Sequence, residues 1–276
     1  MIEARLVWDL WRRILTNDAL ADAARQPSFD FASLGLTPDE TAILADYAST
    51  PAATDQTIFM YRSGLVRNAL SALRLVPLTN RLLYASGLDA DQVARDFTAS
   101  IDYRDDGPNL WRLAGAFVAY LANLPEFAEE PTRAALSIEL SAVALIRRLG
   151  ELPPASWPDD EALQRPSSEG SNRYIASRAA TVASTACDLT PWIENPFSFD
   201  SDGALDAVES HWVIYLPNAD AAPAYAEVSA RAARAFTRLA APKSAAQLAA
   251  ETGLAVADAM EVIESFADLG VVTIAG

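Results

Sequence analysis

The chain has 276 residues, which is long enough for one large domain or two small ones with a buried core. Its 37 acidic and 21 basic residues give a formal net charge of −16, which disfavours general binding to nucleic acids and to anionic membranes. A single cysteine, Cys187, and a single histidine, His211, exclude an intrachain disulfide and leave too few ligands for a zinc cluster or a multi-histidine metal site.

The first residues carry neither a basic segment nor an apolar segment of the kind found in signal peptides. No stretch of the chain approaches 18 consecutive apolar residues, so the 51% hydrophobic content indicates alanine-rich amphipathic helices. We therefore expect a soluble cytoplasmic protein.

The first 150 residues have the apolar periodicity of successive helices. The opening helix places Leu10, Trp11 and Ile14 on one face, and Thr37-Pro38-Asp39-Glu40 has the sequence of a capping box at the start of another helix. Further helices are predicted over residues 55–75, 89–101, 109–124 and 131–149.

Proline, glycine, serine and acidic residues replace the helical pattern over residues 151–172. Such a composition is typical of an interdomain linker. We therefore expect a helical domain over residues 1–150 and a second domain over residues 173–276.

The second domain contains strand patterns. Residues 211–216 alternate in polarity, are rich in aromatic and β-branched residues, and end at Pro217. Residues 174–186 suit a strand through their serine, threonine and valine content, although their apolar spacing also fits a helix; we favour the strand.

The last fifty residues predict three helices and a returning strand. The helices cover about 228–239, 244–253 and 256–269, and the strand follows over 271–274. Ser244 and Gln247 form a second capping box, and glycines end the second and third helices. This pattern predicts a winged helix-turn-helix with a small β-sheet, so the expected fold class is α+β and mostly α.

The third of these helices lacks the residues that DNA recognition needs. Its polar face holds four acids and no base, whereas a helix in the major groove needs arginine, lysine, asparagine or glutamine; the acids are Asp258, Glu261, Glu264 and Asp268. Two interpretations follow: an acidic solvated face on a structural helix, or a winged helix that binds something other than DNA.

The strand at residues 211–216 suits peptide binding if it lies at a sheet edge, where an extended peptide can pair with it. An internal strand that only fills the core is equally consistent with its composition. A catalytic role for His211 or Cys187 has little support, because no nucleophile elbow, P-loop or dinucleotide-binding glycine motif accompanies them.

Two charged residues fall on apolar helix faces. Arg62 lies among Ile58, Val66 and Leu73, and Glu139 lies next to Ala142 and Val143. Since a charge in an apolar environment needs a partner, we expect Arg62 and Glu139 to pair with each other, or to face a bound protein.

Several segments carry a family resemblance. They are residues 226–253 with 266–272 in the second domain, and residues 61–65, 77–79, 107–108 with Trp111, and Glu139 before Arg147-Arg148 in the first. Together they resemble the partner proteins of multinuclear non-haem iron-dependent oxidases in ribosomal peptide natural-product pathways, the family that includes the methanobactin and thiaglutamate pathway partners.

The resemblance implies a protein without catalytic residues or a cofactor of its own. It implies binding to the leader region of a precursor peptide and to a separate oxidase that carries the iron. In the family the leader pairs with the last strand before the helices and packs against the third helix. Here those positions match His211, Trp212, Val213, Ile214, Tyr215 and Leu216, and Ala259, Met260 and Ile263.

Two other functions remain open from the sequence. One is a regulator whose winged helix binds a protein or another ligand. The other is an enzyme that uses Glu139 and His211, which requires both residues to meet in one pocket.

Overall fold

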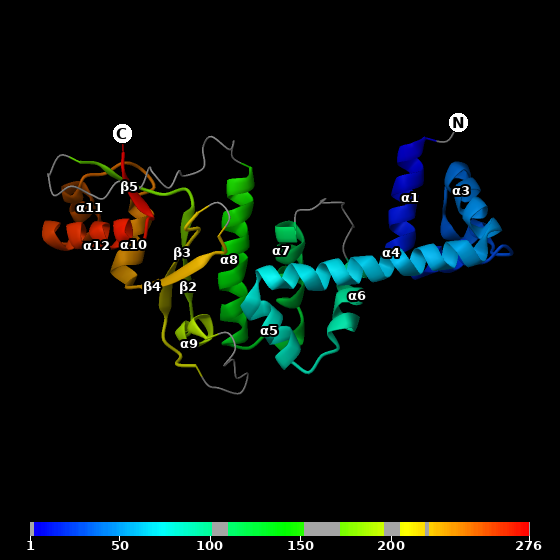
Figure 1. The fold of residues 1–276 in the computed structure, drawn as a ribbon, viewed down its shortest axis with the longest axis horizontal. Helices are drawn as coiled ribbons and strands as arrows, with labels where there is room; N and C mark the ends of the chain where they lie inside the picture. The colour runs from blue at the N-terminus through cyan, green and yellow to red at the C-terminus, as the bar shows by residue number, and fades with distance from the viewer. Residues whose placement is uncertain (1–2, 101–109, 152–171, 196–204, 219–220, 276) are drawn as a thin grey trace. The chain divides into compact units, whose positions relative to one another are not determined.

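The computed structural model describes residues 3–100, 110–151, 172–195, 205–218 and 221–275. The fold is α+β and mostly helical, which confirms the predicted class (Figure 1). The chain forms two compact units, the first from Met1–Arg74 with Gly87–Leu113 and the second from Leu75–Ser86 with Ala114–Gly276.

These units differ from the division expected at residue 150. Helix α8 (Thr132–Gly150) belongs to the second unit because it packs against the strand β2 (Ala180–Thr185). The side chain of Arg148 fixes this contact by donating to the carbonyls of Arg178 and Ala180, both at 3.1 Å. The segment expected as a linker, residues 151–172, lies outside the described residues except at its two ends.

The first unit is helical. Its elements are α1 (Ala4–Thr16), α2 (Asp18–Arg25), η1 (Phe31–Leu34), α3 (Pro38–Ser49), α4 (Pro51–Ala72) and α6 (Ala90–Ser100). The capping box at Thr37 and Glu40 forms as predicted. The core of this unit contains Leu10, Ile14, Leu44 and Ile58, so the apolar face expected of the first helix is buried.

The second unit contains the remaining elements. The helices are α5 (Pro77–Ala85), α7 (Leu110–Leu121, whose first four residues belong to the first unit), α8, α9 (Thr190–Glu194), α10 (Ala230–Arg238), α11 (Ala245–Thr252) and α12 (Val256–Asp268). A short 3-10 turn lies at Pro125–Phe127, and another at Leu73–Leu75, of which only Leu75 belongs to the second unit. The strands are β1 (Tyr174–Ala176), β2, β3 (Ser210–Tyr215), β4 (Ala224–Val228) and β5 (Val272–Ile274).

A three-stranded antiparallel sheet, in the order β2-β3-β4, lies at the centre of the second unit. Helix α8 covers one face, and the α10–α12 cluster covers the other (Figure 1). Val213 of β3 packs into the core of this cluster with Phe236, Ile263 and Phe266. The fully buried Trp212 points to the opposite face, and its Nε1 donates to Thr185 Oγ1 at 2.9 Å.

The winged-helix pattern forms with one difference. The three helices and the returning strand β5 occur as predicted, and β5 pairs with β1 in a separate two-stranded sheet. Residues 174–186 form strands β1 and β2, as favoured from the sequence. Among the described helices, none is long and apolar enough to span a bilayer.

Gly115 allows close contact between α7 and α8. A Cβ atom at this position would lie 2.7 Å from Val143 Cγ1, closer than van der Waals contact allows. We expect Gly115→Ala to lower the free energy of unfolding by about 1–2 kcal/mol, because the stiff Val143 side chain must move. In a Val143→Ala background, Gly115→Ala should no longer destabilise the chain, because the clashing Val143 methyl group is absent and alanine favours a helix over glycine. Urea denaturation of the unaltered chain, the two single variants and the double variant measures the coupling energy between positions 115 and 143. If Gly115→Ala had the same effect in both backgrounds, the predicted clash with Val143 would be contradicted.

Candidate functional site

The backbone directions in the sheet show which groups are open for pairing. The carbonyl of Ala179 accepts from Leu216 on the β3 side, whereas the carbonyl of Ala180 accepts from Arg148. Because successive residues of a strand point their backbone groups to opposite sides, Val182 and Ser184 direct theirs away from β3. Strand β2 is therefore one edge of the sheet.

Strand β4 is the other edge. By the same alternation, His211, Val213 and Tyr215 bond to β4, where their partners are Val228, Ala226 and Ala224. Tyr225 and Glu227 consequently direct their N–H and C=O groups outward, and no described strand pairs with them. Unpaired backbone groups of this kind are what an extended peptide binds by strand addition.

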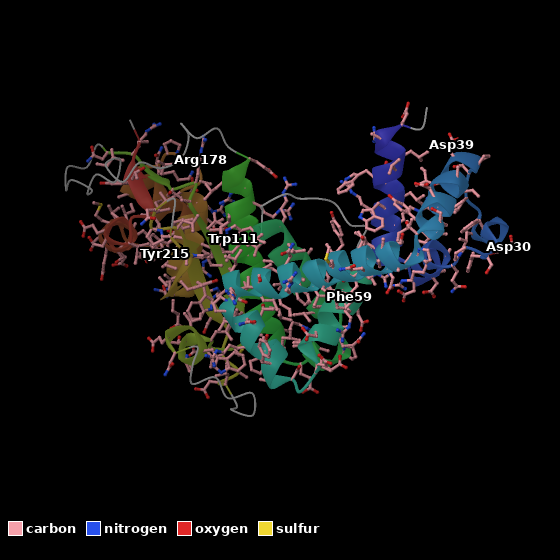
Figure 2. All side chains as sticks on the ribbon, turned by 45° about the vertical axis from the view of Figure 1, so that its right-hand side comes forward. Asp30, Asp39, Phe59, Trp111, Arg178 and Tyr215 are labelled. Carbon is pink, nitrogen blue, oxygen red and sulfur yellow. The ribbon has the colours of Figure 1, made fainter. Side chains whose placement is uncertain are left out.

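The predicted peptide-binding strand is not an edge. Residues His211 to Tyr215 belong to β3, which lies between β2 and β4, and Leu216 follows directly. Trp212, Val213 and Ile214 are buried, while Tyr215 (Figure 2) and Leu216 are partly exposed. The prediction that a peptide pairs with this strand is therefore wrong, because both of its sides already bond to neighbouring strands. The last strand before the helices is β4, which the sequence analysis missed.

The predicted contacts on the third helix are also incorrect. Ala259 and Ile263 are fully buried in the core between the helices and the sheet, and Met260 is partly buried against that core. The side chains of Ala259 and Ile263 are used in folding and are not available to a peptide, whereas Met260 keeps an exposed part. The acidic residues Asp258, Glu261, Glu264 and Asp268 are exposed, so α12 presents a negative face to solvent that opposes contact with DNA phosphates.

Arg62 caps the end of a helix. Its Nε donates to the carbonyl of Leu15 at 3.1 Å, its Nη2 donates to that of Ile14 at 3.2 Å, and its Nη1 lies 2.7 Å from Asp18. The two carbonyls belong to the last turn of α1, which has no helical partners for them. The guanidinium thus satisfies these orphan groups inside the first unit.

Glu139 caps the start of a helix in the second unit. Its side chain is fully buried on α8, and its two oxygens accept from the backbone N–H groups of Leu78 at 2.8 Å and Thr79 at 2.7 Å. These are the first-turn donors of α5, whose own N-cap residue, Val76, has no side chain able to accept them. The ion pair expected between Arg62 and Glu139 does not form, because each binds groups at a helix end within its own unit.

Burial raises the pKa of Glu139 to about 7, although the hydrogen bonds from Thr79 and Leu78 act to lower it. Burial, together with the charge of Glu139, also raises the pKa of the Tyr225 hydroxyl, so Tyr225 stays protonated at neutral pH. Tyr225 belongs to the open strand β4, and its hydroxyl is near enough to Glu139 of α8 for the charge of that carboxylate to act on it.

The raised pKa of Glu139 predicts a pH-dependent stability. The folded chain holds the proton more tightly than the unfolded chain, whose carboxyl keeps its ordinary pKa of 4.5. The corresponding stabilisation is complete below that value and is lost as the pH rises through about 7. The free energy of unfolding should therefore fall between about pH 5 and pH 8, with a slope of up to about 1.4 kcal/mol per pH unit. Glu139→Gln should remove this slope in urea titrations, whereas the exposed control Glu261→Gln should keep it; an unchanged slope in Glu139→Gln contradicts the assignment.

Glu139 and His211 do not form a joint catalytic site. Both belong to the second unit, but Glu139 binds the start of α5, whereas His211 Nδ1 lies 2.7 Å from Ser184 Oγ. The second ring nitrogen of His211 lies 3.9 Å from Glu209, too far for a hydrogen bond, and the Glu209 side chain is 72% exposed. A serine, a histidine and a carboxylate thus lie near one another, without the bond that orients the histidine in a catalytic triad.

Cys187 is not a reactive nucleophile. Burial raises the pKa of the Cys187 thiol to about 11, so it is protonated at neutral pH and a poor nucleophile. Within the described ranges, no group of three histidine, cysteine, aspartate or glutamate side chains is placed to hold a metal ion.

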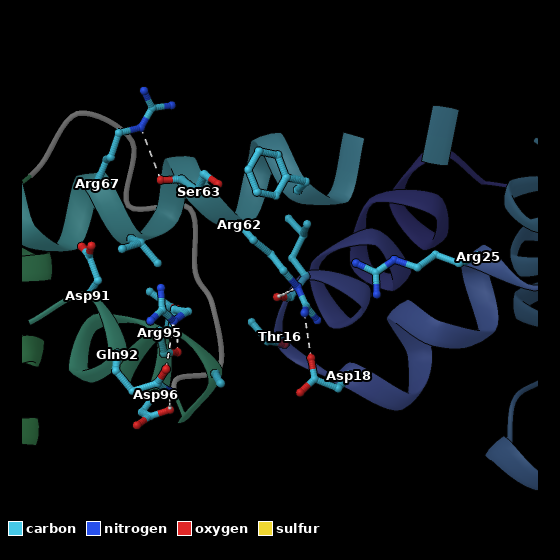
Figure 3. Close-up of a pocket in the computed structure, with 15 residues that line it drawn as sticks. Thr16, Asp18, Arg25, Arg62, Ser63, Arg67, Asp91, Gln92, Arg95 and Asp96 are labelled. Carbon is cyan, nitrogen blue, oxygen red and sulfur yellow. Dashed lines mark hydrogen bonds and ion pairs between the residues drawn. The ribbon is translucent and has the colours of Figure 1, made fainter. Parts of the chain in front are cut away.

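A charged cavity of about 560 Å³ lies in the first unit (Figure 3). Its charged lining consists of Arg25, Arg62, Arg67, Arg95, Asp18, Asp91 and Asp96. Arg62 is held by Asp18, and Arg25 lies 2.7 Å from Asp55, while Arg67 points away from the space between α4 and α6 in Figure 3. The charges are nearly balanced and largely engaged, so this cavity shows no clear selectivity for an anion or a cation.

Comparison with known proteins adds no assignment: no family model matches the chain, and no curated protein matches its sequence.

Proposed function

We propose that this protein is a non-catalytic partner that binds the leader region of a ribosomally made precursor peptide and presents it to a separate multinuclear iron-dependent oxidase in the cytoplasm. The leader adds as a strand to the open edge of β4. The observation that carries this proposal is a three-stranded antiparallel sheet, followed by three helices, whose last strand has outward backbone groups at Tyr225 and Glu227.

The position of β4 supports this choice of edge. It is the last strand before the helices, and Ser229 directly after it caps α10 by accepting from the backbone N–H of Ala232. The resemblance implies that the leader binds at the last strand before the helices; the sequence analysis matched that strand to residues 211–216, whereas in the structure the last strand before α10 is β4. The outward backbone groups of Tyr225 and Glu227 set the register in which a leader strand can pair with β4. The sheet does not have to rearrange to accept this strand.

The charge of the chain supports a peptide and not a nucleic acid as the ligand. The net charge is −16, and the polar face of α12 holds exposed acids without a base. Such a surface repels phosphates and attracts basic side chains. We therefore expect a leader that carries lysine or arginine near its contact with the helices.

The chemistry of the chain supports a partner role. The thiol of Cys187 is buried and protonated, and among the residues that the structure describes no carboxylate lies within hydrogen-bond distance of His211. The peptide-modifying chemistry is therefore assigned to the oxidase, which carries the iron, and this chain contributes recognition.

Co-expression tests this proposal. The genes next to that of this chain are searched for an iron-dependent oxidase and a short peptide. The chain is then produced alone and together with them, and the products are analysed by size exclusion and metal content. We expect a heteromeric complex in which the iron belongs to the oxidase and the peptide is retained only when this chain is present. The proposal is contradicted if the chain elutes alone, does not bind the peptide, or binds iron itself. Co-purification of a different protein would favour the alternative function, a regulator whose winged helix binds a protein.

A further inference from the structure

The opposite edge of the sheet has its own open backbone groups. Val182 and Ser184 of β2 direct their N–H and C=O groups away from β3, and no described residue bonds to them. At the start of the strand, both backbone groups of Ala180 are occupied: its carbonyl accepts from Arg148, and its N–H donates to the carbonyl of Ser177 at 3.3 Å. Each of the two free residues offers one donor and one acceptor to an added strand.

A groove runs beside this edge. One cavity of about 600 Å³ and a second of about 280 Å³ lie between β2 and α10, and both are lined by Val182 and Thr237. The first extends to Ala176 and Phe236, and the second extends to Ser184. The two cavities share Val182 and Thr237, so they lie next to each other along β2; we call them together the β2–α10 groove, since an extended segment needs space along a strand.

The groove is basic on a strongly acidic chain. Its charged lining consists of Arg148, Arg178, Arg234 and Glu209, and His211 is also present. Arg178 (Figure 2), in the turn between β1 and β2, and Arg234 on α10 are exposed, and neither forms an ion pair with the residues that the structure describes. Helix α10 carries three arginines and no acid, whereas the whole chain has 37 acids and 21 bases.

We propose that the groove between β2 and α10 binds an extended protein segment rich in aspartate and glutamate. The segment adds as a strand to Val182 and Ser184, and its acidic side chains meet Arg178 and Arg234. This site is independent of the leader site, because it lies on the other edge of the sheet and selects the opposite charge. One sheet can therefore hold two segments at once.

Fluorescence anisotropy with the full chain tests this site. The probe is a labelled short peptide of alternating glutamate and β-branched residues, and its counterpart has lysine at each glutamate position. We expect the acidic probe to bind in a salt-dependent manner and the lysine probe to bind at least about tenfold more weakly. Arg234→Glu, an exposed change on α10, should weaken the acidic probe by about tenfold without affecting folding.

Proline variants separate the two edges. Ser184→Pro removes an outward N–H that no strand uses and should abolish binding of the acidic probe, whereas Ser184→Ala, which keeps the N–H, should bind it as the unaltered chain does. Glu227→Pro, on β4, should leave the affinity for the acidic probe unchanged. Loss of the leader site and loss of the β2–α10 site are therefore distinguished by which proline variant weakens which peptide. Equal affinity for both probes, no binding by the unaltered chain, or unchanged binding by Arg234→Glu would overturn the proposal.

Discussion

Glu139→Ala is expected to lower the free energy of unfolding by about 3–5 kcal/mol, a large share of the stability of a typical domain. The two oxygens of the Glu139 side chain accept from the N–H groups of Leu78 and Thr79, both in buried surroundings. Each donor left without a partner costs about 1–3 kcal/mol, and the truncated side chain also leaves a cavity. Urea denaturation at about pH 6 measures the loss.

Two controls accompany this variant. Glu139→Gln keeps one acceptor oxygen and should lose less than half as much stability, because only one of the two N–H groups loses its partner. Glu261→Ala removes an exposed carboxylate from α12 and should change the free energy of unfolding by less than about 0.5 kcal/mol. A Glu139→Ala protein as stable as the Glu261→Ala control would show that α5 does not depend on this cap.

Glu227→Pro is expected to weaken leader binding by at least about a hundredfold, which corresponds to about 2.8 kcal/mol. Proline removes an outward N–H from β4 and places its ring where the added strand must lie. The internal pairing with β3 stays intact, because Glu227 does not bond to that strand. Anisotropy titration of a labelled leader peptide measures the affinity, and thermal unfolding confirms that the variant is folded.

Matched variants isolate the cause of this loss. Glu227→Ala keeps the backbone donor and removes only the carboxylate, so its leader affinity should stay within about threefold. Ser184→Pro makes the equivalent change on β2 and should leave leader affinity unaltered. If Ser184→Pro abolishes leader binding and Glu227→Pro does not, the leader uses the other edge of the sheet.

Local chemistry made the helices predictable. The capping boxes at Thr37 and Ser244, and the apolar stripes of α1 and α12, depend on residues close together in the sequence. The strand β4 was missed because residues 224–228 are short, contain two alanines and run directly into a helix. The strand conformation of β4 depends on its pairing with β3, and this pairing cannot be predicted from the sequence of residues 224–228 alone.

The site residues failed as predictions for a related reason. The composition of residues 211–216 identifies a strand, but its place between two neighbours is a property of the sheet. Ala259 and Ile263 are apolar, which suits a peptide contact and a core position equally well. In the structure both residues belong to the core. Arg62 and Glu139 were correctly expected to need partners, but those partners are backbone groups at distant helix ends.

The most direct test of strand addition is amide hydrogen exchange in the complex of the full chain with the leader peptide. Hydrogen bonds to an added strand slow exchange at the amides that donate them. We predict that leader binding protects the amides of Tyr225 and Glu227 and leaves those of Val182 and Ser184 unchanged. Protection confined to Val182 and Ser184, or none on either edge with the leader fully bound, would contradict the account.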